Sequence, residues 1–183
     1  MQGPAHASIG RTSFNLGAKV GKIAGALCLA LMACFLALPA HANPKYAALV
    51  IDAHTGQVLY SRNADEPRYP ASLTKVMTLY LLFEKLEKGE ATLKSRITMT
   101  QRGANQPPSK LGLGVGQTIS VEDAILALIT RSANDVASAT GAFIAGSEDN
   151  FAVMMTKKAR ALGMSKTTYK NASGLPNRQQ LTT

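Results

Sequence analysis

The residues best suited to chemistry are a serine and a lysine three positions apart, in the segment Ser72-Leu73-Thr74-Lys75. A serine hydroxyl becomes a nucleophile when a base within hydrogen-bond reach takes its proton, and lysine can be that base when burial lowers its pKa. Positions i and i+3 of a helix share a face, so the amine can reach the hydroxyl. At a helix start, free backbone N–H groups can also stabilise an oxyanion. The segment therefore predicts covalent catalysis by Ser72 with Lys75 as the base.

A second segment, Ser132-Ala133-Asn134, strengthens this hypothesis. An S-x-x-K alone could arise by chance in a chain with 12 serines and 12 lysines, and an ordinary helix surface is then the simpler interpretation. Ser132 and Asn134 fall between two expected helices, where a hydroxyl and an amide could both point into a cleft. The two segments together indicate a site more specifically than either does alone.

Other hydrolytic chemistries fit the chain poorly. His54 is the sole histidine after residue 42, and it falls in an expected turn, so a Ser-His-Asp arrangement would need that turn to face a nucleophile. One histidine and no cysteine after residue 42 cannot supply the usual nitrogen and sulfur ligands of zinc. The residue types therefore argue against a zinc carboxypeptidase.

The first 42 residues are typical of a secretory signal peptide. They hold an apolar run, 23–38, followed by Ala40-His41-Ala42, which matches an A-x-A cleavage site. The basic residues of this segment, which has no acidic ones, are Arg11, Lys19 and Lys22. A run of 16 residues is shorter than the span of about 20 that crosses a bilayer, which favours cleavage over a membrane anchor. Lipidation at Cys34 is less favoured, because apolar residues continue after it.

The expected mature domain, residues 43–183, has no cysteine, because Cys28 and Cys34 both precede it. An exported fold without disulfides must be held together by its core. The 17 basic and 11 acidic residues of this domain leave a net charge of about +6. Such a charge suits an anionic polymer such as cell wall, whereas export and the lack of a basic run argue against nucleic acid. A surface that is merely basic and soluble is an equally good interpretation.

The residue pattern predicts two strands and then several helices. Residues 46–52 and 57–61 read as antiparallel strands joined by a turn at 53–56. A long, largely buried helix is expected from Ser72 to Lys88, with Gly89 ending it. Its expected apolar face holds Val76, Leu79, Tyr80, Phe83 and Leu86.

Residues 101–117 look like a loop, and Ser120 then resembles the cap of a helix that runs to about Arg131. After the break at 132–134, further helices are expected at 135–145 and 149–162, and a turn-rich segment at 171–177. The last helix should bury Phe151, Met155, Ala159 and Leu162 and end at Gly163. Two strands alone are marginally stable, so the pattern predicts that more sheet follows.

Four segments together resemble the low-molecular-weight D-alanyl-D-alanine carboxypeptidases, which are penicillin-binding serine peptidases with S-x-x-K, S-x-N and K-T-G motifs. These segments are PASLTKVMT at 70–78, DAHTG at 52–56, SAND at 132–135 and NASGL at 171–175. The resemblance covers nearly all of residues 46–183. It implies an α+β fold of the β-lactamase/transpeptidase type, in which helices flank an antiparallel sheet and a helical subdomain carries Ser132. That fold would be incomplete at its carboxy-terminal end.

The resemblance also implies roles for four residues. Ser72 would attack the carbonyl between the two terminal D-alanines of a peptidoglycan pentapeptide, and Lys75 would take its proton. Ser132 would relay a proton to the leaving D-alanine, and Asn134 would hold Lys75 and the substrate's amide. Water would release the shortened peptide, and β-lactams would acylate the same Ser72. The resemblance implies no metal and no organic cofactor. The expected location is the periplasm or the outer face of the bacterial cytoplasmic membrane, with membrane association left open.

The chain departs from the family at the third motif. Lys166-Thr167-Thr168 is not K-T-G, and His54-Thr55-Gly56 belongs to the first turn. The resemblance therefore implies a partial catalytic domain whose own activity is open. A DD-endopeptidase would use the same residues, and an inactive cell-wall-binding module could keep the same scaffold. A class A β-lactamase would need a glutamate-bearing loop, for which Glu148, the one glutamate beyond Ser132, gives no support.

Overall fold

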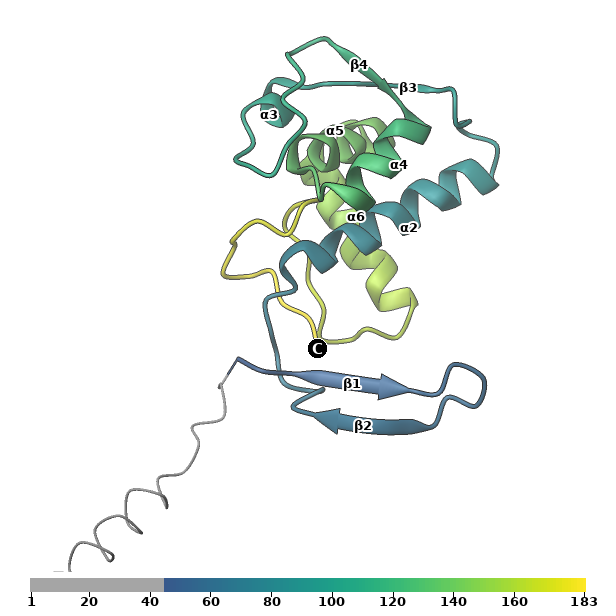
Figure 1. Ribbon diagram of the computed structural model, residues 1–183, viewed down its shortest axis with the longest axis vertical. Helices are drawn as coiled ribbons and strands as arrows, with labels where there is room; N and C mark the ends of the chain where they lie inside the picture. Colours follow the sequence, from purple (N-terminus) through teal and green to yellow (C-terminus); the bar gives the residue numbers. More distant parts are fainter. Residues whose placement is uncertain (1–44) are drawn as a thin grey trace, which may run out of the picture. The chain divides into compact units, whose positions relative to one another are not determined.

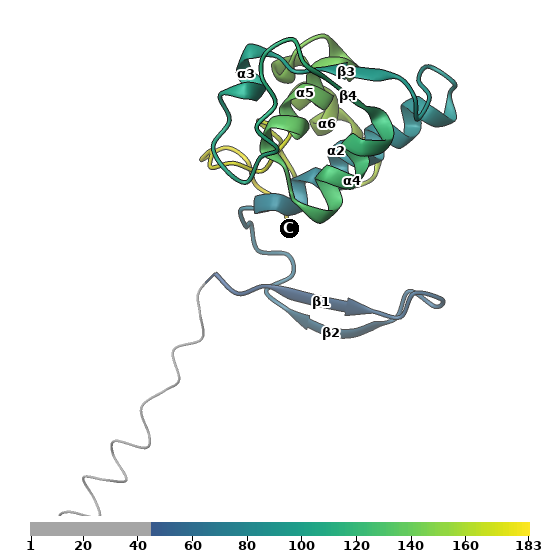
Figure 2. The same ribbon diagram turned by 45° about the horizontal axis from the view of Figure 1, so that its top comes forward.

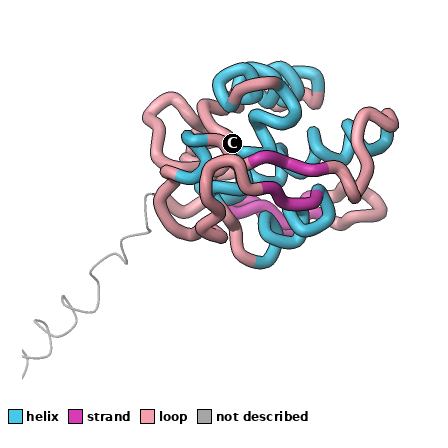
Figure 3. Tube along the Cα trace, turned by 90° about the horizontal axis from the view of Figure 1, so that it is seen from above, coloured by secondary structure: helices cyan, strands magenta, loops and turns pink. Residues whose placement is uncertain are grey.

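A computed structural model of the chain describes residues 45–183 (Figure 1). The expected signal peptide, residues 1–42, and its boundary with the following domain lie outside these described residues. In chain order the elements are β1 (Ala48–Ile51), β2 (Val58–Arg62), η1 (Ala71–Leu73), α2 (Thr74–Glu87), β3 (Arg96–Thr98), α3 (Gln101–Ala104), β4 (Thr118–Ser120), α4 (Val121–Thr130), α5 (Asn134–Ala145) and α6 (Glu148–Ala161). Helices and two antiparallel strand pairs make this part of the chain α+β, as expected (Figure 3).

The first strand pair is the expected hairpin. Its turn is closed by Asp52, whose carboxylate accepts hydrogen bonds from the backbone N–H groups of His54 and Thr55 at 3.0 and 2.7 Å. Gly56 follows with a φ of +72°, a conformation that favours glycine. Within residues 45–183, β1 and β2 contact no other element, and the apolar side chains on both faces of the hairpin are exposed.

Helix α5 is the centre of the helical part. Its first eight residues, 134–141, are all buried, and it contacts α2, α3, α4 and α6 (Figure 2). Small residues allow this close packing: a Cβ on Gly141 would lie 2.8 Å from the Phe151 ring of α6. Phe151, Met155 and Ala159 of α6 are fully buried, as expected, whereas Leu162 is half exposed, contrary to expectation. Leu162 follows the last helical residue, where the chain turns away from the core toward Gly163.

Helix α2 buries only part of the face that the apolar pattern predicted, since Leu79 and Leu86 of that face pack against the core and are partly buried. The buried side chains are Met77, Thr78, Leu81 and Leu82, with Lys75 and Thr74 at the start of the helix. Val76, Tyr80 and Phe83 are instead exposed. Helix α2 is therefore apolar on two sides, and the pattern alone could not show which side faces α4, α5 and α6.

The segment between α2 and α4 holds more structure than expected. Residues 101–104 form the short helix α3 within the expected loop, capped by Thr100, whose side chain accepts from Gly103 N. Strands β3 and β4, which the sequence did not indicate, pair antiparallel on either side of it. The expected cap of α4 is confirmed, since Ser120 Oγ accepts from Asp123 N at 3.0 Å. Within residues 45–183, none of the helices has the length and apolar character needed to cross a bilayer.

Candidate active site

Ser72 and Lys75 lie where the 3-10 turn η1 runs into helix α2. Ser72 is exposed, whereas Lys75 is only 3% exposed. A nucleophile has to be reached by its substrate, and a lysine acts as a base when it is desolvated. Ala71, directly before Ser72, has a φ of +46°, which is uncommon for a residue with a side chain. The first turn thus exposes the hydroxyl, buries the amine and carries backbone strain beside the serine.

Two neutral oxygens hold the Lys75 amine. Lys75 Nζ donates to Asn134 Oδ1 at 2.8 Å and to the carbonyl oxygen of Ser173 at 2.7 Å. Among the described residues, Lys75 forms no ion pair that would stabilise its charged form. Burial therefore dominates and lowers the pKa of Lys75 from 10.5 to about 8. An amine with this pKa is partly neutral near physiological pH and can accept a proton.

Asn134 is oriented by a loop that crosses the start of α5. Its Nδ2 donates to the carbonyl of Pro107 at 3.0 Å, which directs Oδ1 toward Lys75. Its backbone N–H donates to the carbonyl of Ser109 at 2.8 Å. The next residue, Asp135, is fully buried and accepts from the backbone N–H groups of Leu111 and Gly112. Hydrogen bonds therefore join the loop 105–117 to the start of α5, and each segment keeps the other in place.

Ser132 lies in that break with a φ of +52°. It is half-buried, and its hydroxyl makes no hydrogen bond within residues 45–183. Non-glycine residues with positive φ are strained and gather at functional sites when the surrounding fold enforces them. Here the enforcing contacts come from its neighbours: Arg131 O accepts from Ser109 Oγ, and Ala133 N donates to Ala127 O.

The segment 171–175 forms the third wall, beside the start of α2 (Figure 1). Asn171 Oδ1 accepts from the backbone N–H groups of Ser173 and Gly174 at 3.2 and 2.7 Å, which folds the segment into a tight turn. The Ala172 carbonyl accepts from Thr78 Oγ1 at 2.7 Å, one turn along α2 from Lys75. This turn presents the Ser173 carbonyl to the lysine.

Lys75 and Asn134, which are 59 residues apart in the sequence, form a direct hydrogen bond in the structure. Ser72 is one helical turn from Lys75, but no hydrogen bond of the described residues joins its hydroxyl to the amine. The Ser173 carbonyl was not anticipated. The pattern Asn171-Ala172-Ser173-Gly174 indicates a turn. Every residue has a backbone carbonyl, however, so the sequence cannot show which carbonyl accepts from Lys75.

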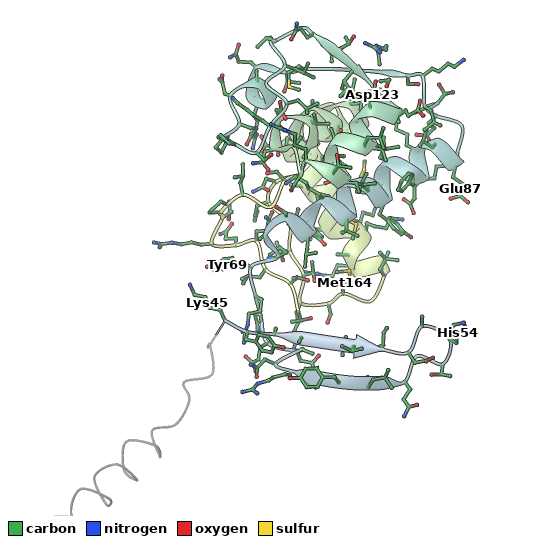
Figure 4. All side chains as sticks on the ribbon, in the orientation of Figure 1. Lys45, His54, Tyr69, Glu87, Asp123 and Met164 are labelled. Atoms are coloured by element: carbon green, nitrogen blue, oxygen red, sulfur yellow. The ribbon has the colours of Figure 1, made fainter. Side chains whose placement is uncertain are left out.

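The two segments that partly resemble the K-T-G motif, residues 54–56 and 166–168, form contacts away from Lys75. His54 occupies the hairpin turn, remote from Tyr69, which leads into η1 (Figure 4). Lys166 Nζ donates to the carbonyl of Asp65, and Thr168 pairs with Leu181 in an isolated bridge. Neither segment contacts Lys75.

A cavity of about 420 Å³ adjoins the first turn of α2. One side is formed by residues 69–71 and the other by Gly174, Leu175, Pro176, Asn177, Arg178 and Gln180. The lining includes the residue that precedes Ser72 but none of the four predicted site residues. The cavity therefore lies beside Ser72 without enclosing it.

Comparison with known proteins defines the family. Residues 39–183 match the family model described as Peptidase_S11, D-alanyl-D-alanine carboxypeptidase. The chain is 36% identical over 134 residues to the D-alanyl-D-alanine carboxypeptidase DacF of Bacillus subtilis, covering 73% of this chain and 34% of that protein. It is 35% identical over 131 residues to a D-alanyl-D-alanine endopeptidase of Pseudomonas aeruginosa, covering 70% and 41%. The chain belongs to the Peptidase_S11 family.

Solved structures agree with this assignment. The D-alanyl-D-alanine carboxypeptidase DacD of Francisella tularensis superposes with a TM-score of 0.72 at 32% identity, over 75% of this chain and 33% of that one. Penicillin-binding protein D2 of Listeria monocytogenes, in its cefotaxime-bound form, superposes with a TM-score of 0.64 at 34% identity, over 75% and 56%. The expected penicillin-binding, transpeptidase-like fold is therefore confirmed for the part present. The chain spans about a third of the length of the curated carboxypeptidases it matches.

Proposed function

We propose that this chain carries the nucleophile half of a serine D-alanyl-D-alanine carboxypeptidase, with Ser72 as nucleophile and Lys75 as general base. The observation that carries the proposal is the buried Lys75 amine. It lies one helical turn from an exposed serine, its pKa is lowered to about 8, and its hydrogen bonds go to neutral acceptors. A surface lysine on an ordinary helix has none of these properties.

The chemistry is acyl transfer in two steps. The neutral Lys75 amine takes the proton of Ser72 Oγ, which attacks the carbonyl carbon of the substrate's terminal peptide bond. The C–N bond breaks, the leaving D-alanine amine takes up a proton through Ser132, and an ester to Ser72 remains. Water then attacks the ester and releases the shortened peptide and the Ser72 hydroxyl. Asn134 holds Lys75 in place and offers its amide to the substrate.

The substrate class follows from the family. Relatives of this chain are named for D-alanyl-D-alanine cleavage, so the proposed substrate is a peptidoglycan pentapeptide. Two structures of one relative, penicillin-binding protein D2 of Listeria monocytogenes, are of its cefotaxime-bound and ampicillin-bound forms, which supports β-lactams as inhibitors that acylate Ser72. Such a substrate lies outside the cytoplasm, and the proposed location is the periplasm or the outer face of the cytoplasmic membrane.

Cleavage of cross-links is the second candidate function, because one relative is named an endopeptidase. Release of D-alanine from a pentapeptide, compared with conversion of a cross-linked dimer to monomers, separates the two reactions. A class A β-lactamase gains no support. The Glu148 carboxylate is buried, is paired with Arg102, and already accepts hydrogen bonds from Ser138 Oγ and Ala172 N.

The test is labelling of the full chain with a fluorescent penicillin, followed by denaturing electrophoresis. The chain should be labelled, Ser72→Ala should abolish the label, and Ser165→Ala should not, because Ser165 is exposed and its side chain has no hydrogen-bond partner among the described residues. A folded chain that takes no label would refute the proposal for this chain. It would instead favour an inactive cell-wall-binding module on the same scaffold.

A further inference from the structure

Glu148 is a buried carboxylate that the catalytic scheme above does not use. Its side chain is 2% exposed, at the first residue of α6. A buried charge is stable only when it is paired and hydrogen-bonded. Glu148 Oε2 forms an ion pair with Arg102 Nε at 2.8 Å and accepts a hydrogen bond from Ser138 Oγ at 2.6 Å, and Oε1 accepts from the backbone N–H of Ala172 at 3.0 Å. Its partners come from α3, α5 and the turn 171–175.

The contact with Ala172 leads directly to the candidate base. The next residue, Ser173, gives its carbonyl to Lys75 Nζ at 2.7 Å, and the Ala172 carbonyl binds Thr78 Oγ1 of the same helix. The turn 171–175 is thus fixed on one side by Glu148 and on the other by α2. Glu148 is therefore one of the groups that hold the turn carrying the Ser173 carbonyl.

The contact with Ser138 leads back to the same lysine. Ser138 is four residues after Asn134 on α5, so the two side chains share a face of that helix. Asn134 Oδ1 is the other acceptor of Lys75. The contacts therefore close a ring, which runs from Lys75 through the turn to Glu148, through Ser138 to α5, and through Asn134 back to Lys75.

We propose that Glu148 is a positioning residue for Lys75, acting through the turn 171–175 and through α5 to keep both acceptors of the amine in place and water out. The expected effect on acylation rests on the proposed function, whereas the effect of Glu148 on the position and pKa of Lys75 does not. The charged groups around the ring are Glu148, its partner Arg102, and Asp149, which pairs with the same Arg102. Asp135 also lies nearby, but its carboxylate accepts from the N–H groups of Leu111 and Gly112. Among residues 45–183, no carboxylate forms an ion pair or hydrogen bond with Lys75.

The inference predicts that loosening the turn hydrates the amine. Water then replaces the Ser173 carbonyl as acceptor and stabilises the charged form, so the pKa of Lys75 rises toward its ordinary value. A rise of about one unit lowers the neutral fraction near pH 7 by roughly tenfold. A residue that only stabilises the fold would leave the pKa of Lys75 in the folded protein unchanged.

The experiment measures the Lys75 titration by NMR of 13Cε-labelled lysine in the full chain, with Lys75→Arg to identify the signal. Glu148→Met fills the space without accepting hydrogen bonds and should raise the Lys75 pKa by roughly one unit. Glu148→Gln keeps an acceptor for Ala172 N and should restore a value close to that of the original chain. The matched controls are Asp149→Ala, which removes the adjacent charge on the same Arg102 partner, and Phe151→Leu, which loosens the α6 core. Both should leave the Lys75 pKa unchanged.

An unchanged Lys75 pKa in folded Glu148→Met would overturn the inference, as would an equal shift in Phe151→Leu. If Glu148→Met does not fold, amide hydrogen exchange in the unsubstituted chain decides whether Glu148 holds the turn 171–175 in place. Slow exchange of the Ala172 N–H supports a turn held by Glu148, and exchange as fast as that of the exposed Arg178, whose backbone N–H has no acceptor among the described residues, contradicts it. These readouts need no acylation, so a chain that fails to bind penicillin still tests Glu148. Where acylation does occur, its rate at pH 7 should fall roughly tenfold in Glu148→Met.

Discussion

Gly174 packs directly onto the carbonyl of Ala71, so that a Cβ added to Gly174 would lie 1.8 Å from that oxygen. Gly174 also has a φ of +89°, which side chains rarely adopt. The turn that supplies an acceptor for Lys75 is therefore pressed against the residue that precedes Ser72. Only a glycine fits this contact.

Gly174→Ala should accordingly destabilise the chain and displace the turn. The positive φ alone costs about 1–2 kcal/mol. The clash with backbone should add about 1–3 kcal/mol. Gly163→Ala is the matched control, because Gly163 has a φ of +82° and no atom within 4 Å of an added Cβ. Denaturant unfolding of the two variants measures the difference, and equal losses would show that the contact with Ala71 does not matter.

Acylation by penicillin should depend on pH through Lys75. Burial lowers the pKa of this amine to about 8, and only its neutral form accepts the Ser72 proton. The acylation rate should therefore rise with pH up to about 8 and level off above it. Stopped-time labelling between pH 6 and pH 9 measures this profile. A rate that does not change over that range would exclude Lys75 as the base.

Asn134→Asp should lower the acylation rate at neutral pH by more than the small difference in size between the two side chains suggests. A carboxylate at this position would lie beside the Lys75 amine and stabilise its charged form, raising the Lys75 pKa by about 1–3 units. The pH at which acylation reaches half its maximal rate should move upward by the same amount. Asn150→Asp, the same change at an exposed position of α6, should leave the profile in place. A loss of rate without a shift in the profile would contradict this explanation.

The burial of α2 gives a further prediction. Leu82 is fully buried, so Leu82→Ala should cost about 2–5 kcal/mol of unfolding free energy. Val76 is 63% exposed, and Val76→Ala should change stability by no more than about 0.5 kcal/mol. The sequence pattern alone predicts the opposite order, because it assigns Val76 to the core. Urea unfolding of both variants decides between the two assignments.

The sequence predicted this site better than the surroundings of the site. Its motifs identified Lys75 and Asn134, which the structure joins by a hydrogen bond, and turn and cap residues such as Gly56 and Ser120 marked element ends. It missed β3 and β4, because strands of three residues are too short to show a period. It predicted the buried face of α2 only in part, because that helix has apolar residues on two sides. It gave Glu148 no role, because three of its contacts come from segments that only tertiary folding brings together.

The most direct test of the central claim is to locate the adduct that benzylpenicillin forms with the full chain, by intact-mass measurement and then peptide mapping. We predict one adduct per chain, on the peptide that contains Ser72, lost in Ser72→Ala and strongly reduced in Lys75→Met. An adduct on another residue, or a folded chain that forms none, would contradict the claim that Ser72 is a nucleophile activated by Lys75.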